Sequence, residues 1–246
     1  MDYHVVIPAR WASTRLPGKM LADLAGKPMV VRTAERARLS DAQSVTIATD
    51  YEPIAQAARE HGLHAVMTRG DHQSGTDRLS ETVQLMQWPD SAIVVNVQGD
   101  EPRIDPALIG ELAQCLAKNP EAAIATAAAR MTDQANVANP NAVKVVLDQK
   151  SQALYFSRAA IPFMRTPVTG LSALHHIGIY AYRVRFLKIF PGLTQGLLER
   201  AESLEQLRAL EHGWKIQVLV TEREHAPGVD TEQDLLQARQ FYASTI

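Results

Sequence analysis

The stretch His4-Val5-Val6-Ile7-Pro8-Ala9-Arg10 is apolar from Val5 to Ala9 and ends on a cation. An apolar run that does not alternate with polar residues is typical of a strand buried on both faces of a parallel sheet. Similar runs follow at 45–48, 65–67 and 93–97, and helical patterns separate them at about 28–39, 52–61, 76–87 and 106–118. The alternation predicts an α/β fold with a Rossmann-like, mostly parallel sheet and helices on both faces.

The second half of the chain departs from this rhythm. Two short strands are predicted at 143–147 and 153–156 without a helix between them, and 161–173, with two prolines and a glycine, is expected to form a loop or arm. The remaining expected elements are a strand at about 177–182, a helix around 198–211, a strand at 216–220 and a helix from about Thr231. We therefore expect one domain over 1–246 with a smaller insert at about 130–190.

The composition argues against several classes of protein. The 246 residues carry a formal net charge of −2 and a single cysteine, Cys115. This charge disfavours a general nucleic-acid or membrane surface, and one cysteine cannot form an internal disulfide or a multi-cysteine zinc site. The first strand leaves no room for a signal peptide before it, and no apolar run approaches the ~20 residues of a membrane span. We expect a cytoplasmic protein.

The loop after the first strand concentrates three cations, Arg10, Arg15 and Lys19. It matches neither a Walker loop, because Ser13 and Met20 stand where that motif needs other residues, nor a G-x-G-x-x-G fingerprint. Arginine can grip phosphate oxygens in pairs and lysine acts as a point charge, so such a loop suits a triphosphate. The alternative is a solvated basic loop. The position of the loop at the end of a strand favours phosphate binding over this alternative.

Polar residues follow three of the predicted strands at once: the loop after the first, 49–50 after the second, and 98–101 after the fourth. Open parallel sheets bind ligands beyond the carboxyl ends of their strands. We therefore expect the cationic loop and Asp100 to face the same edge.

Residues 7–19, IPARWASTRLPGK, resemble the nucleotide-binding loop of the cytidylyltransferases that activate acidic sugars, most closely those acting on 3-deoxy-D-manno-octulosonate (Kdo). The resemblance runs nearly end to end, through 71–78 (DHQSGTDR), 96–102 (NVQGDEP), 139–144 (NPNAVK), 154–158 (LYFSR), 176–180 (HIGIY), 204–208 (LEQLR) and 228–231 (GVDT). It implies the reaction CTP + Kdo → CMP-Kdo + diphosphate, for lipopolysaccharide synthesis, by a homodimer that uses Mg²⁺.

The resemblance also implies roles for individual residues. Asp100 and Asp230 would hold the metal and, with the three loop cations, form the catalytic set. The nucleotide would be bound by Pro8, Ala9, Arg10, Arg15, Lys19, Ser74, Gly75, Arg78 and Gln98. The sugar would be bound by Gln98, Arg158, His176, Tyr180, Glu205 and Gln206.

Taken without the resemblance, several of these residues have plainer readings. Ser74 is an ordinary helix cap, and Asp230 could belong to the cap of the last helix, although Thr231 can serve there with Asp234. Glu205 and Gln206 lie off the apolar stripe of their predicted helix, which suits a site and solvent equally. Trp11 and Asp50 are expected to be structural.

Other functions stay open at this point. The chain could activate a related acid sugar, such as 8-amino-Kdo or a sialic acid. A glycosyltransferase holding a sugar nucleotide on the same sheet is a second option, although its usual Asp-x-Asp motif is not matched by residues 98–100. A nucleotide-binding module without catalysis is a third, opposed by the two candidate metal carboxylates.

Overall fold

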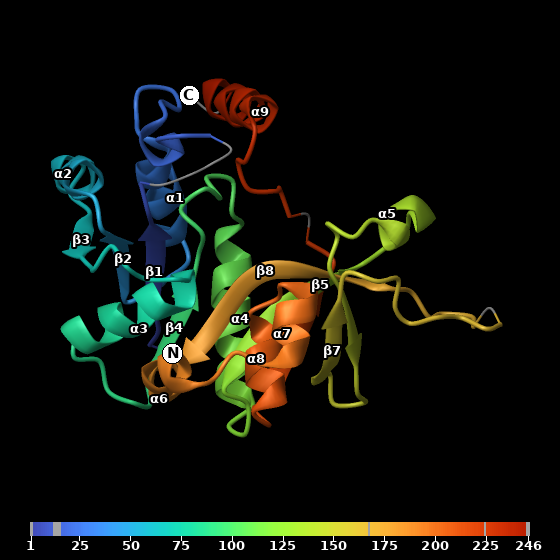
Figure 1. Cartoon of the computed structure of the whole chain (residues 1–246). Helices are drawn as coiled ribbons and strands as arrows, with labels where there is room; N and C mark the ends of the chain where they lie inside the picture. The colour runs from blue at the N-terminus through green and yellow to red at the C-terminus, as the bar shows by residue number, and fades with distance from the viewer. Residues whose placement is uncertain (1, 12–15, 167, 224, 245–246) are drawn as a thin grey trace.

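The computed structural model describes residues 2–11, 16–166, 168–223 and 225–244. In these ranges one large sheet runs in the order β3-β2-β1-β4-β8-β5-β9, and a hairpin of β6 and β7 joins it through β8 (Figure 1). The strands are β1 (His4–Ala9), β2 (Ser44–Thr49), β3 (His64–Met67), β4 (Ile93–Asn96), β5 (Ile124–Arg130), β6 (Lys144–Leu147), β7 (Ala153–Ser157), β8 (Leu174–Arg183) and β9 (Ile216–Thr221).

The strands from the first half of the chain are parallel, as their buried apolar runs predict. β1 pairs in parallel with β2 and β4, and β2 with β3. β5 and β9 are also parallel, while β8 lies antiparallel between β4 and β5. The prediction of a mostly parallel α/β sheet is confirmed, and the Ala-rich run before residue 130 forms a strand in it.

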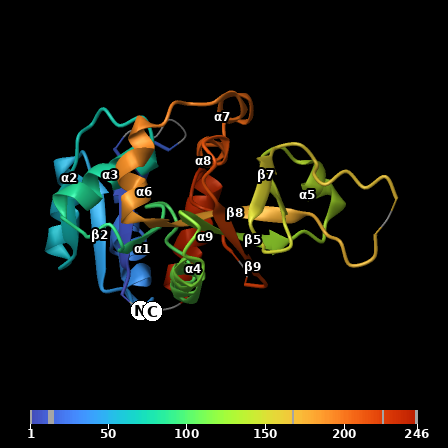
Figure 2. The same ribbon diagram turned by 90° about the horizontal axis from the view of Figure 1, so that it is seen from below.

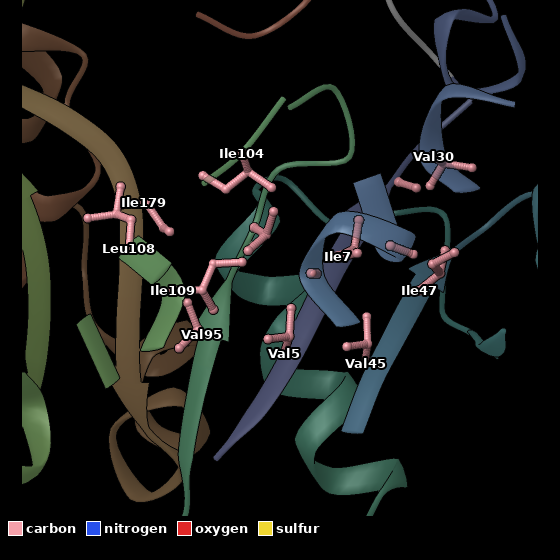
Figure 3. Close-up of a cluster of buried hydrophobic side chains, with 14 of the residues drawn as sticks. Val5, Ile7, Val30, Val45, Ile47, Val95, Ile104, Leu108, Ile109 and Ile179 are labelled. Carbon is pink, nitrogen blue, oxygen red and sulfur yellow. The ribbon is translucent and has the colours of Figure 1, made fainter. Parts of the chain in front are cut away.

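Helices cover both faces of the sheet because successive strand residues point to opposite sides. Val5 and Ile7 pack under α1 (Met29–Arg38), α2 (Glu52–Glu60), α4 (Pro106–Lys118) and α9 (Glu232–Ala243), in the core drawn in Figure 3. Val6 faces the other side, where α3 (Gly75–Leu85), α6 (Val184–Ile189) and α8 (Gln206–Glu211) close a second core (Figure 2). The described helices are all too short or too polar to cross a bilayer.

Three helix starts follow their sequence signals. Asp105 caps α4 by accepting from the amide of Ala107. Ser74 with Asp77, and Thr231 with Asp234, form reciprocal capping boxes at the starts of α3 and α9. These caps satisfy amides that the helices cannot satisfy internally.

The prediction of a single helix around 198–211 is wrong. The segment forms α7 (Leu197–Glu202) and α8, separated at Ser203, whose φ is 52°. The break lets Arg208 reach back to the Glu199 carboxylate at 2.6 and 2.7 Å. Nine residues of continuous helix would separate these two positions by about 13.5 Å along the axis, so the pair could not form.

The segment expected as an insert contains α5 (Gln134–Ala138), the β6–β7 hairpin and an arm from residue 159 to 173. Figure 1 shows the arm extending away from the sheet. The end of the expected range, β8 and α6, lies in the main sheet and its covering layer. Two short 3₁₀ turns, η1 (Lys19–Leu21) and η2 (Phe190–Gly192), complete the described elements.

Candidate active site

Lys19 joins two aspartates that are far apart in the sequence. Its Nζ donates to Asp100 Oδ2 at 2.5 Å, to Asp230 Oδ1 at 2.9 Å and to the main-chain oxygen of Val229 at 3.0 Å. An ammonium has three protons, and all three are used here. The structure thus brings together three of the residues expected to form the catalytic set.

Close backbone packing creates this meeting point. Lys19 opens η1 directly after Gly18, which has a φ of 70°. Gly99 packs so tightly that an added Cβ would lie 2.9 Å from Met20 Sδ and 3.1 Å from the main-chain oxygen of Pro8. The loop after β4 therefore lies directly on the end of β1 and on η1.

The last segment of the chain joins the same place. The amide of Val229 donates to the main-chain oxygen of Asp100 at 2.8 Å, and the Val229 side chain is fully buried. This anchor sets Asp230 beside Asp100, just before the cap of α9.

One ammonium lies between two carboxylates in this cluster. Burial alone would lower the pKa of Lys19, but the charges and hydrogen bonds of Asp100 and Asp230 outweigh it and the net pKa is raised. Lys19 is 8% exposed, whereas the two aspartate side chains are 22% and 37% exposed. The two carboxylates are therefore more accessible from solvent than the ammonium between them.

Glu101, beside this cluster, was not singled out from the sequence. Its side chain is buried, and burial together with the charge of Asp100 raises its pKa to about 8. The side chain is consequently mostly protonated at neutral pH and adds little negative charge next to the aspartates.

The N-terminus of α3 lies at the same edge of the sheet. An added Cβ on Gly75 would be 3.9 Å from Pro8 Cγ, so the helix starts against the end of β1. Thr76 Oγ1 donates to Glu205 Oε1. Burial raises the pKa of Glu205 even though Ser74, Thr76 and Arg208 act to lower it. The expected nucleotide residues Ser74 and Gly75 therefore lie beside an expected sugar residue.

Three further nucleotide candidates lie at the ends of the neighbouring strands β1 and β4. Arg10 is exposed directly after β1, Ala9 is buried at its end, and Gln98 is half-buried after β4. Arg15 lies outside the described residues.

Arg78 is buried, donating to Thr68 Oγ1 and, at 2.9 Å, to Asp50 Oδ2. Asp50 is thus the partner of a predicted ligand, and the proposed contact of Arg78 with cytosine stays a prediction. Trp11 stacks on Tyr51 with ring centroids 4.4 Å apart.

Four of the expected sugar residues lie on β8 and at the start of α8. The ring centroids of His176 and Tyr180 are 5.4 Å apart, and Tyr180 pairs with Asn96 at the end of β4, two residues before Gln98. The Glu205 charge contributes to the raised pKa of Tyr180, after burial and Tyr182. Gln206 is buried, and its Nε2 has no hydrogen-bond partner in the described chain.

Arg158 ends the β7 hairpin and is held by the end of α7. Its Nε donates to the main-chain oxygen of Glu202 at 2.7 Å and its Nη1 to that of Pro140 at 3.0 Å. The Glu202 carboxylate accepts from the Arg158 amide at 2.9 Å and from Ser157 Oγ at 2.6 Å. Sequence reasoning missed Glu202, because it offers no motif and meets Arg158 only through the fold.

This geometry has close counterparts among known proteins. The model of the family described as Cytidylyltransferase matches residues 4–222. The chain belongs to the cytidylyltransferase family. It is therefore a nucleotidyltransferase, which sets aside a glycosyltransferase and a module without catalysis. CTP-using cytidylyltransferases typically need a divalent metal.

Two solved structures show how far the similarity extends. A CMP:2-keto-3-deoxy-manno-octonic acid synthetase complexed with CTP is 41% identical, with a TM-score of 0.92, over 100% of this chain and 99% of that one. A cytidylyltransferase from Leptospira borgpetersenii serovar Hardjo-bovis is 18% identical, with a TM-score of 0.64, over 100% and 87%. The second shares the fold alone.

Proposed function

We propose that this cytidylyltransferase converts CTP and Kdo into CMP-Kdo and diphosphate, supplying activated sugar for lipopolysaccharide synthesis. The supporting observation is the 41% identity over the whole chain to a synthetase named for 2-keto-3-deoxy-manno-octonic acid, which is Kdo. The anomeric hydroxyl of the sugar attacks the α-phosphorus, the new oxygen–phosphorus bond forms, the bond to the β-phosphate oxygen breaks, and the hydroxyl proton is released. Both reactants are anions, so alignment and charge neutralisation are the main tasks.

Asp100 and Asp230 would hold a divalent ion, for which we propose Mg²⁺. They fit it, because Mg²⁺ is commonly bound by one or two carboxylates plus substrate phosphates, and because the two carboxylates already share one cation in this structure. When bound, the ion supplies positive charge at the phosphates.

Lys19, Arg10 and Arg15 would hold the triphosphate. Lys19 would have to leave at least part of its present contacts with the aspartates in order to reach a phosphate oxygen. Pro8, Ala9, Ser74, Gly75, Arg78 and Gln98 are proposed for the rest of the nucleotide, and Gln98, Arg158, His176, Tyr180, Glu205 and Gln206 for the sugar.

We further propose a cytoplasmic homodimer. The support is the arm, where Phe163 is 89% exposed and Val168 and Leu171 are also exposed, since apolar side chains in such numbers on a projecting segment favour a partner surface. Sedimentation of the chain and of a Phe163→Ser variant tests this, with a shift towards monomer expected for the variant.

The reaction is tested by diphosphate release with CTP and Mg²⁺ and a panel of acid sugars: Kdo, 8-amino-Kdo and a sialic acid. We expect the highest kcat/KM with Kdo. Release with none of the three, or a clear preference for sialic acid, would overturn the proposal. Omitting the metal should abolish release.

A further inference from the structure

A buried threonine holds the expected sugar ligand His176 in place. Thr126 Oγ1 lies 3.0 Å from His176 Nε2, 2.8 Å from the main-chain oxygen of Ile179 and 3.2 Å from that of Ile177. Thr126 is fully buried in β5, which lies between β8 and the edge strand β9. The hydroxyl therefore meets one ring nitrogen and two carbonyl oxygens.

An irregularity in β8 creates this arrangement. Thr126 pairs with Tyr180, but the next residue, Ala127, pairs with Ile177, so two residues of β8 bulge out. Without the bulge His176 would lie opposite Arg130; with it, His176 lies opposite Ala128, about 7 Å nearer to Thr126 along the strand. A shift of two residues also keeps His176 on the same face. Bulges of this kind often aim side chains at active sites.

The three contacts determine where the protons lie. A carbonyl oxygen only accepts, so the single hydroxyl proton of Thr126 has to point at the carbonyls. If it pointed at His176 instead, the oxygen lone pairs would face two carbonyl oxygens at 2.8 and 3.2 Å, which is repulsive. The hydroxyl consequently accepts from His176, and Nε2 carries the ring proton.

The ring itself is neutral and fixed. Burial, with a smaller contribution from His175, lowers the pKa of His176 to about 3. Phe156 from β7 packs edge-on at 5.0 Å between centroids, and Tyr180 is tilted against the ring at 5.4 Å. Burial, with a smaller contribution from the charge of Lys144 opposite it on β6, lowers the pKa of the neighbouring His175. No described residue contacts Nδ1 by a hydrogen bond.

We propose that Thr126 is a positioning residue that holds His176 in the Nε2–H tautomer, so that Nδ1 accepts a hydrogen bond from a hydroxyl of the acid sugar. The identity of the ligand rests on the proposed function, whereas the tautomer does not. His176 then selects for a donor at one position of the sugar and contributes no charge to binding.

The experiment compares Thr126→Val, which keeps the shape and removes the hydroxyl, with Thr126→Ser, which retains it. Long-range ¹H–¹⁵N spectra of the ligand-free protein report the tautomer of His176, with its signals assigned by their loss in His176→Asn. We expect one tautomer, protonated on Nε2, in the wild type and in Thr126→Ser, and a mixture in Thr126→Val.

Kinetics supply the second readout. Loss of one oriented hydrogen bond should raise KM for Kdo about 3–10-fold in Thr126→Val and leave KM for CTP unchanged. Thr46→Val is the matched control, because Thr46 is also buried and also contacts a histidine, His64, at 3.2 Å but lies on β2; it should change neither constant.

A wild-type ring protonated on Nδ1 would overturn the inference, as would a Thr126→Val protein with unchanged tautomer and unchanged KM for Kdo. Failure of the proposed function would instead appear as absence of turnover by the wild type, with the spectra unaffected.

Discussion

Two buried ion clusters in this molecule are built in opposite ways. Arg208 meets Glu199, nine residues away in the sequence, with two hydrogen bonds to its carboxylate. Lys19 meets Asp100 and Asp230 across 81 and 211 residues, and its single ammonium bridges two carboxylates. Both cations are largely buried, at 14% and 8% exposure.

The difference distinguishes a pair that stabilises the fold from a cluster that belongs to the candidate active site. The two matched hydrogen bonds between Arg208 and Glu199 join α7 to α8. In the Lys19 cluster two carboxylates are held close together, at a cost in repulsion between them, and both are more exposed than the ammonium. Two partly exposed carboxylates, brought together from distant segments of the chain, are therefore the physical signature of the site here.

The largest effect on stability is expected from Arg208→Met. This change leaves the Glu199 carboxylate buried, at 4% exposure, without its partner, and breaking such a pair typically costs about 3–5 kcal/mol. Urea unfolding measures the loss, and kcat of the folded variant should fall far less than in the aspartate variants below, because Arg208 acts on the expected sugar residue Glu205 only by its charge. The double variant Glu199→Leu with Arg208→Met should recover much of the stability. An Arg208→Met protein as stable as the wild type would show that the pair of Arg208 and Glu199 does not stabilise the fold.

Asp100→Asn and Asp230→Asn should each reduce activity much more than they reduce stability. Each should lower kcat by at least ~10²-fold, the scale of one lost electrostatic stabiliser. The free energy of unfolding should change by only about 1 kcal/mol, because Lys19 keeps its other partners. Near-normal turnover in both variants would contradict the metal assignment.

In the His176→Asn variant, the free energy of unfolding should depend less on pH than it does in the wild type. The wild-type ring stays neutral in the folded state, with a pKa lowered to about 3, but titrates near 6.5 when unfolded. The unfolded state alone therefore gains a proton as pH falls below 6.5, and His176 should account for about 2 kcal/mol of stability lost between pH 7 and 5.

Because the pKa of Glu101 is raised to about 8 in the folded protein, Glu101 makes the protein more stable as the pH falls from 7 to 5. Glu101 is present in both the wild type and the variant, so its contribution cancels when the two are compared. The measurement is the free energy of unfolding of the wild type and of the variant at pH 7 and at pH 5. Equal losses in both proteins would mean that His176 titrates normally in the folded state.

The smallest of these effects is expected from Lys19→Met. Without the ammonium, the aspartates should bind Mn²⁺ at least about tenfold more tightly in the absence of nucleotide, because one charge-assisted contact no longer competes. KM for CTP should rise more than KM for Kdo.

Electron paramagnetic resonance measures the Mn²⁺ affinity, and Lys27→Met, which breaks the surface pair with Glu35, is the matched control. Unchanged Mn²⁺ affinity and equal rises in both KM values would show that Lys19 neither competes with the metal nor holds the triphosphate.

Local features of this chain were open to prediction. The apolar runs at β1, β2 and β4, the proline after Asp105 and the capping box at Thr231 all act within a few residues, and the structure confirms each. The break at Ser203 was missed because Arg208 and Glu199 attract each other only after both have folded against the core. A lone threonine in the alanine run of β5 was a usable signal for a buried polar contact, and it was overlooked.

By itself, the sequence determined the strand and helix types, the helix caps and the placing of cations after the first strand, because these depend on period and on neighbours along the chain. Only the tertiary structure decided that Lys19 lies between Asp100 and Asp230, that β8 enters antiparallel between β4 and β5, and that a bulge brings His176 to Thr126. Such contacts join residues dozens to hundreds of positions apart. They depend on how whole elements pack, which no local pattern encodes.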